Sequence, residues 1–117
     1  MRGGERFSQV RIVRDKITRY LLNTNHAEGR GKAEFFTSIG FTPDRPEELE
    51  DILSSHPQTA EFKGETPSFN GVNYTFTCDI KAPNGRVFCI VSVWFIEQGK
   101  TTPRLITAYP AKKRKRS

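Results

Sequence analysis

The hydrophobic period of the chain changes near residue 58, and this change constrains the fold more than any other feature. Before it, apolar residues recur at helical spacing; after it, apolar and polar residues alternate as in half-buried strands. The 117 residues suffice for one domain with one core. We therefore predict an α+β fold in which about three N-terminal helices pack on one face of a C-terminal four-stranded antiparallel sheet.

Three helices are predicted between residues 15 and 56. The first begins at Asp15 as N-cap and ends near Asn23, before the polar loop TNHAEGRG. The second begins near Gly31 and ends at Gly40. Its buried positions are Ala33, Phe36 and Ile39. In the third, Asp44 and Glu47 form a capping box around Pro46, and His56-Pro57 ends the helix.

Four strands are predicted near residues 60–65, 73–82, 86–97 and 104–109. Asn84-Gly85 favours a two-residue type I′ turn, which pairs Pro83 with Arg86 and sets the register of the hairpin. Eight residues then face the helices: Tyr74, Phe76, Cys78 and Ile80 opposite Phe95, Val93, Val91 and Cys89. The opposite, open face receives Thr75, Thr77, Asp79, Ser92, Trp94 and Ile96.

The last strand, RLITAYP, is expected to bury Ile106 and Ala108 and to place Thr107 and Tyr109 on the open face, although Leu105 fits this assignment poorly. Thr107 and Tyr109 are ordinary strand formers, but they also offer two hydroxyls beside Trp94, whose ring can stack on a base.

Basic residues are concentrated at the two ends of the chain. Nineteen Lys and Arg against 13 Asp and Glu give a net charge of +6. We expect a flexible basic arm at 1–8, a single domain at 9–110 and a disordered basic tail at 111–117. Basic ends favour a polyanionic partner because Lys and Arg displace phosphate counterions, and a merely solvated surface is equally compatible with this charge.

Several functional classes are excluded by what the sequence lacks. The polar N-terminus and the absence of a long apolar run predict a cytoplasmic protein with no membrane segment. Cys78 and Cys89 are expected to be packed free thiols. His26 and His56 stand in no metal-binding motif, and no nucleotide fingerprint is present, so we expect neither metal nor cofactor.

The loop segment NHAEGRGK gathers groups suited to RNA cleavage. His26 suits proton transfer, and Arg30 and Lys32 can stabilise a charged phosphorane. Glu28 has no assigned role. A loop histidine is more often exposed to solvent without a function, and His56 is the weaker candidate because a histidine in the last turn of a helix is explained by the helix dipole.

The motifs YLLN (20–23), GRGKAEFF (29–36), GFTP (40–43) and TAYP (107–110) resemble a bacterial family of domains of unknown function, family 6883. Members are often small proteins, sometimes encoded beside another small protein as toxin–antitoxin pairs are. The order of helices and sheet is also similar to the superfamily of barnase, RelE-type and colicin-type ribonucleases, whose active site lies on the open sheet face.

This resemblance implies a catalytic set and a set of substrate contacts. The implied catalytic residues are His26, Lys32, Thr107 and Tyr109. The implied phosphate contacts are Arg30 and Arg104. Trp94, Thr75 and Thr77, on the predicted open face, are further candidates for substrate binding. The resulting hypothesis is a metal-independent endoribonuclease acting on tRNA or mRNA, neutralised by a cognate antitoxin or immunity protein. The alternative is a non-catalytic module that binds nucleic acid or protein, such as an antitoxin or a phage accessory protein.

Overall fold

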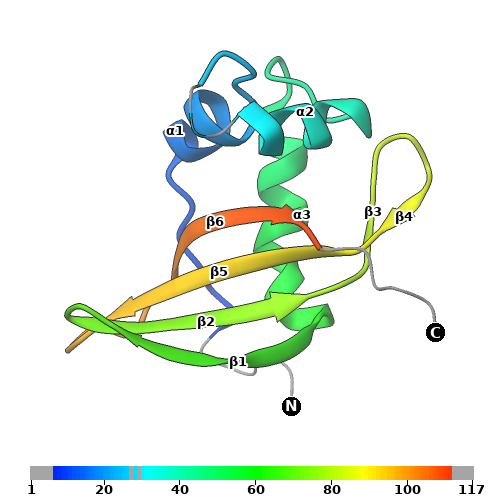
Figure 1. The fold of residues 1–117 in the computed structure, drawn as a ribbon. Helices are drawn as coiled ribbons and strands as arrows, with labels where there is room; N and C mark the ends of the chain where they lie inside the picture. The colour runs from blue at the N-terminus through cyan, green and yellow to red at the C-terminus, as the bar shows by residue number, and fades with distance from the viewer. Residues whose placement is uncertain (1–6, 27, 29, 112–117) are drawn as a thin grey trace.

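The structure is a computed structural model that describes residues 7–26, 28 and 30–111. The helical segments are α1 Arg14–Lys16, the π-helix η2 Ile17–Leu21 that continues it, α2 Arg30–Ser38 and α3 Pro46–Thr59. The strands are β1 Glu61–Ser68, β2 Gly71–Thr77, β3 Ile80–Lys81, β4 Val87–Phe88, β5 Ile90–Glu97 and β6 Arg104–Pro110. The predicted order of helices followed by an antiparallel sheet is confirmed (Figure 1).

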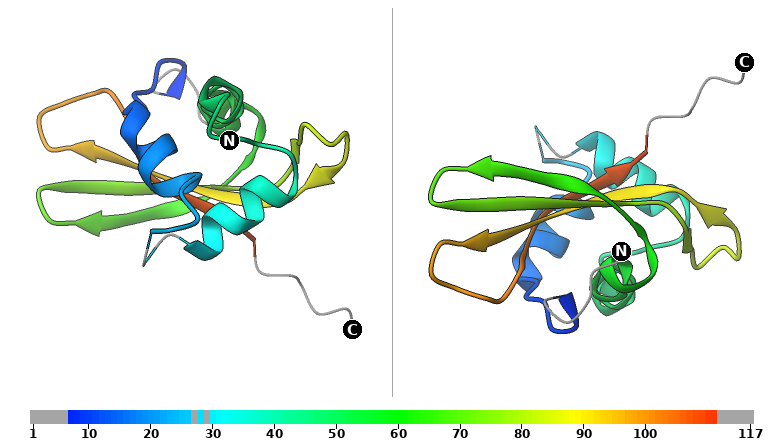
Figure 2. Two further views of the ribbon diagram at one scale, coloured as in Figure 1. Left: turned by 90° about the horizontal axis from the view of Figure 1, so that it is seen from above. Right: turned by 90° about the horizontal axis from the view of Figure 1, so that it is seen from below.

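Four strands form the main sheet in the order β1-β2-β5-β6, and β3 and β4 form a separate two-stranded ribbon. α3 crosses one face of the main sheet, whereas η2 and α2 lie over its β6 edge (Figures 1 and 2). Edge strand β6 is therefore the strand that meets the helical half of the molecule.

The predicted N-caps at Asp15 and Asp44 are wrong, and proline chemistry explains the start of α3. Pro46 disfavours helical geometry in the residue before it, so Arg45 becomes the N-cap, with φ −131°. The capping box of Asp44 and Glu47 is therefore not formed. The helix also continues past Pro57 to Thr59. Similarly, α1 starts at Arg14 after the N-cap Val13 rather than at Asp15.

The hairpin turn adds one residue to the predicted loop. The Gly85 N–H donates to the Ala82 carbonyl at 2.9 Å, and the Ala82 N–H donates to the Arg86 carbonyl at 2.9 Å. Pro83 is therefore part of the loop, and the predicted pairing of Pro83 with Arg86 is wrong. The register moves by one, so that Tyr74 pairs with Trp94.

A slip of one residue exchanges the two faces of a strand, because side chains alternate with a period of two. The buried positions of β2 and β5 are Tyr74, Phe76, Ile90, Ser92, Trp94 and Ile96. The half-buried residues of the opposite face, called the open face below, are Thr75, Thr77, Val91, Val93, Phe95, Thr107 and Tyr109. The predicted open-face position of Trp94 is wrong, because its side chain is 0% exposed.

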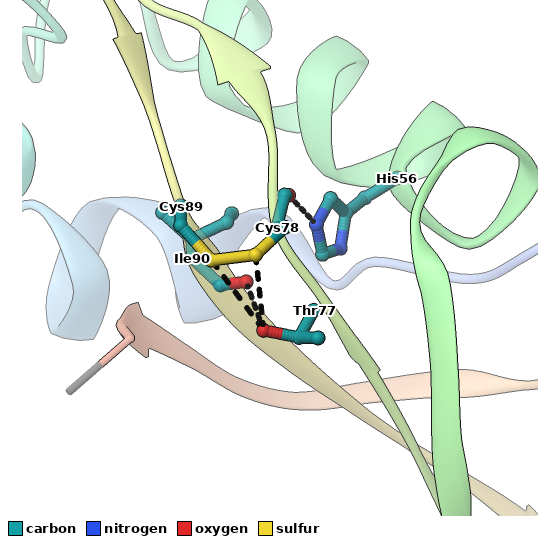
Figure 3. Close-up of a disulfide and its surroundings, with 5 residues drawn as sticks. All are labelled: His56, Thr77, Cys78, Cys89 and Ile90. Atoms are coloured by element: carbon teal, nitrogen blue, oxygen red, sulfur yellow. Dashed lines mark hydrogen bonds between the residues drawn. A yellow bond between two sulfur atoms is a disulfide. The ribbon is translucent and has the colours of Figure 1, made fainter. Parts of the chain in front are cut away.

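Cys78 and Cys89 form a disulfide, so the expectation of free thiols is wrong (Figure 3). Cys78 has φ +88°, which ends β2 and turns the chain toward the β3–β4 ribbon. The Thr77 hydroxyl lies 3.6 Å from the Cys89 sulfur and donates to the Ile90 carbonyl at 3.3 Å. The disulfide thus joins the two chain segments at the point where the main sheet gives way to the ribbon.

A bulge in the β5–β6 pairing corrects the assignment of the last strand. Leu105 and Ala108 are buried, at 3% and 0% exposure, while Ile106 lies in the bulge and is half-buried. The prediction for Ala108 is confirmed and that for Ile106 is wrong. The bulge shifts the phase of the strand, and Thr107 and Tyr109 consequently remain on the open face.

The segment before α1 is part of the fold. Phe7, assigned from sequence to a loose arm, packs edge-on against Tyr74 and Phe76 and is 2% exposed. Arg11 forms a parallel bridge to Arg104 at the β6 edge. The rest of the predicted arm, residues 1–6, and residues 112–117 of the predicted tail lie outside the described residues.

Candidate functional site

Tyr20 and Lys32 meet where η2 and α2 approach each other. Lys32 Nζ donates to the Tyr20 phenol oxygen at 2.5 Å and lies 4.9 Å from the centre of the Tyr20 ring. Lys16 Nζ lies 5.1 Å from the same centre. Two ammonium groups are thus close to the same tyrosine side chain. The phenol oxygen of Tyr20 is therefore in a strongly positive environment.

The same cluster reaches the open face of β6. Lys32 Nζ is 6.0 Å from the centre of the Tyr109 ring. Thr107 Oγ1 lies beside the Tyr20 phenol and is shielded from solvent. Among the described residues it has no partner in standard hydrogen-bond geometry. The helical and sheet halves thus contribute an ammonium group, two phenols and one unsatisfied hydroxyl to one place.

This environment shifts the acidity of Tyr20. The hydrogen bond from Lys32 is the largest influence and lowers the pKa of the phenol, while partial burial opposes it. The neighbouring Thr107 hydroxyl and the charges of Lys32 and Lys16 lower the pKa further. The phenolate of Tyr20 is therefore more accessible than that of an ordinary tyrosine, which makes this residue suitable for accepting a proton.

His26 lies next to this cluster and is oriented by the backbone. Its ring centre is 5.0 Å from that of Tyr20, with the two planes at 89°. The Glu28 N–H donates to His26 Nδ1 at 3.1 Å. Nδ1 is therefore an acceptor, and in the neutral ring the proton is on Nε2.

The predicted substrate contacts are dispersed over the molecule. Arg30 is exposed at the start of α2, 3.7 Å from Glu34. Arg104 lies at the other end of β6, with its guanidinium carbon 5.3 Å above the Phe95 ring. Thr75 and Thr77 are on the open face of β2, across from Val93 and Val91. Trp94 is in the core and cannot stack on a base, because its side chain has no exposed surface.

Tyr20 is the site residue that sequence reasoning missed. At position 20 an aromatic residue fits the apolar stripe of a helix, so the sequence predicts a core position for Tyr20 and no role for its hydroxyl. The available signal was the YLLN motif, which begins at Tyr20. Within the described residues, no three or more His, Cys, Asp or Glu side chains gather as a metal site.

The comparisons with known proteins agree with this fold. The model of the family described as "Domain of unknown function (DUF6883)" matches residues 4–112. A chain of the structure described as a contact-dependent growth inhibition toxin–immunity protein complex from Klebsiella pneumoniae 342 has the same fold. It aligns with a TM-score of 0.68 and 12% identity, covering 86% of this chain and 98% of its own. No curated protein sequence matches.

In the part of the chain that the structure describes, no helix combines the length and the apolar character of a membrane span.

Proposed function

The chain belongs to the DUF6883 family, and on that premise we propose that it is a small metal-independent endoribonuclease of the toxin type. The observation that carries the proposal is the contact between the Lys32–Tyr20 pair and the Thr107 and Tyr109 side chains at the β6 edge. These groups combine a cation with hydroxyl donors, which suits the charge and the oxygens of a phosphodiester. We propose RNA, as tRNA or mRNA, as the substrate.

The chemistry assigned to this site is transfer of the phosphoryl group to the neighbouring 2′ oxygen. The phenolate of Tyr20 takes the proton from the 2′-OH and becomes a neutral phenol, the 2′ oxygen bonds to phosphorus, and the bond to the 5′ oxygen breaks. For this step the His26 ring is an imidazolium, protonated on both nitrogens; it gives one proton to that leaving oxygen and becomes neutral. Lys32 stabilises the charged phosphorane, and the Tyr109 hydroxyl donates to a non-bridging oxygen. The Thr107 hydroxyl, which is shielded from solvent, holds the Tyr20 phenol in place instead of touching the phosphate.

The fold similarity is compatible with a role in a toxin–immunity pair. The matched structure contains a toxin and its immunity protein. We propose a partner of the same kind, an antitoxin or immunity protein, for this chain. Such a partner would prevent cleavage most directly by covering the open face near β6.

The test is cleavage of labelled RNA by purified protein in the presence of EDTA. Lys32→Ala should reduce the cleavage rate by about 10²–10³-fold, the usual effect of losing a group that stabilises transition-state charge. Lys16→Ala is the matched control, because Lys16 lies at nearly the same distance from the Tyr20 ring, whereas Lys32 also approaches Tyr109. Loss of cleavage in EDTA, or equal effects of the two changes, would contradict the mechanism.

The open face itself favours the alternative, a non-catalytic binding module. Val91, Val93 and Phe95 form a half-buried apolar row on β5. An apolar row of this kind suits a protein partner as well as a nucleic acid. If the wild-type protein binds RNA or a protein partner tightly and cleaves no RNA, the binding module is the correct reading.

A further inference from the structure

The open face extends well beyond the proposed catalytic cluster. At the other end of β5 and β6, two adjacent surface pockets of about 430 and 450 Å³ share the side chains of Phe95, Glu97 and Arg104. Phe95 pairs with Arg104, whereas Val91 pairs with Tyr109. Four residue steps along β5 therefore separate this end from Tyr109, a distance of about 13 Å at about 3.3 Å per residue.

Two aromatic side chains are accessible at these pockets. Phe69, in the turn between β1 and β2, is 95% exposed and lines one pocket. Phe95 is half-buried, lies on the open face and carries the Arg104 guanidinium 5.3 Å above its ring. A fully exposed phenylalanine contributes little to stability, and exposed aromatic rings beside cations are typical platforms for unpaired bases.

Three cationic side chains surround the first pocket. Arg11, Lys100 and Arg104 line it together with hydroxyls of the loop before β6. Among the described residues that line the two pockets, Glu97 is the acidic one. A carboxylate repels a phosphate but accepts N–H groups from the edge of a base. The pockets thus combine phosphate-binding cations with stacking rings and a group that can read a base.

We propose that these pockets bind a flanking segment of single-stranded RNA, so that the substrate runs along β5 and β6 from Tyr109 to Phe69. This inference rests on the proposed ribonuclease function and adds the substrate class and its length. At about 3.4 Å per nucleotide in a stacked strand, 13 Å corresponds to about four nucleotides, and to fewer in an extended strand. A paired duplex would keep its bases from stacking on Phe69 and Phe95.

The experiment measures the affinity of single-stranded oligoribonucleotides that increase from two to eight nucleotides, with the hairpin-paired octamer as comparison. Affinity should rise steeply once the strand spans both sites. Phe69→Ala should weaken binding of the octamer by about 5- to 100-fold, the loss of one stacked base, and leave the dinucleotide unaffected. Val87→Ala is the matched control, because Val87 is 61% exposed but lies on the β3–β4 ribbon.

The outcomes separate this inference from the function on which it rests. If no oligonucleotide binds or is cleaved, the ribonuclease proposal itself fails. If RNA is cleaved but affinity does not depend on length, or Phe69→Ala behaves like Val87→Ala, only the flanking-strand inference is overturned. Tighter binding of the paired octamer would likewise overturn it.

Discussion

His56 Nδ1, on α3, lies 2.7 Å from the Ser92 hydroxyl in the middle of β5. The Trp94 indole N–H donates to the same hydroxyl at 2.9 Å, and His56 Nε2 lies 2.7 Å from the Cys78 carbonyl. A carbonyl can only accept, so Nε2 carries the proton and Nδ1 accepts from Ser92. The chain of donors is complete only when the imidazole is neutral.

This network predicts a loss of stability in mild acid. Burial lowers the pKa of His56 below its usual value, and the bond to the Cys78 carbonyl partly opposes the shift. As the pH falls below about 6.5, the unfolded chain binds a proton that the folded chain resists, so the free energy of unfolding falls by up to about 1.4 kcal/mol per pH unit. Urea unfolding at pH 7.5, 6.5 and 5.5 should show this slope. His56→Gln should be less stable at pH 7.5 and lose most of the slope; equal slopes would contradict the prediction.

The Cys78–Cys89 disulfide predicts that reductant destabilises the protein. Reduction frees the intervening loop in the unfolded state, which typically costs about 2–4 kcal/mol. Denaturant unfolding with and without reductant measures the difference. The Cys78→Ser/Cys89→Ser double variant should match the reduced wild type and not respond to reductant. Free thiols detected by mass spectrometry in the air-exposed native protein would refute the pairing.

The assigned role of His26 predicts a substrate-dependent defect. Because His26 is the proposed general acid, the His26→Ala variant should cleave ordinary RNA about 10²–10⁴-fold more slowly than the wild type. RNA with sulfur in place of the leaving 5′ oxygen needs no proton on departure. Its cleavage should therefore be nearly equal for wild type and His26→Ala, and an undiminished defect on this substrate would exclude the acid role.

The Lys32–Tyr20 hydrogen bond predicts a measurable change in phenol ionisation. Because Lys32 lowers the pKa of Tyr20, Lys32→Met should move ionisation of that phenol to higher pH. The ultraviolet absorbance of phenolate reports the titration, and Tyr20→Phe identifies which component belongs to Tyr20. An unchanged component in Lys32→Met would show that the ammonium does not act on the phenol.

The basic C-terminal residues predict a salt-dependent contribution to RNA affinity. Residues 112–116 are KKRKR. Deleting 112–117 should weaken RNA binding at low salt and reduce the slope of log affinity against log salt by about 0.7 for each phosphate that the tail neutralises. Fluorescence anisotropy at several salt concentrations measures the slope. An identical slope would show that the tail takes no part.

The arrangement of elements followed from periodicity, but the register of the central hairpin did not. The run VFCIVSVWFI in β4 and β5 is apolar at both parities, so no alternation fixed which residues face the core. Asn84-Gly85 then suggested a two-residue turn, although Pro83 also belongs to the loop. Because the prediction left Pro83 out of the loop, it placed Trp94 on the wrong face of the sheet. The predicted face of Thr75 and Thr77 is correct.

The candidate site was predictable only in part, because its parts come from distant segments. His26 and Lys32 were identifiable by residue type in a loop near a helix, and Thr107 and Tyr109 by their parity in the last strand. Tyr20 joins them through an approach of η2 to α2 and β6 that no local pattern encodes. A phenol on an apolar stripe is recognised as a polar group only when its partner, Lys32, is known.

Both borders of the sheet resist pairing with another molecule. On β1 the strand is irregular between Phe62 and Gly64, carries exposed charges and contains Pro67, which lacks an N–H. On β6 the Arg11 N–H and carbonyl already bond Pro103 and Leu105. These features disfavour the addition of a strand from a second copy or an inhibitor, and they make a surface of side chains the better docking site. The protein can expose an apolar row on β5 without polymerising through its edges.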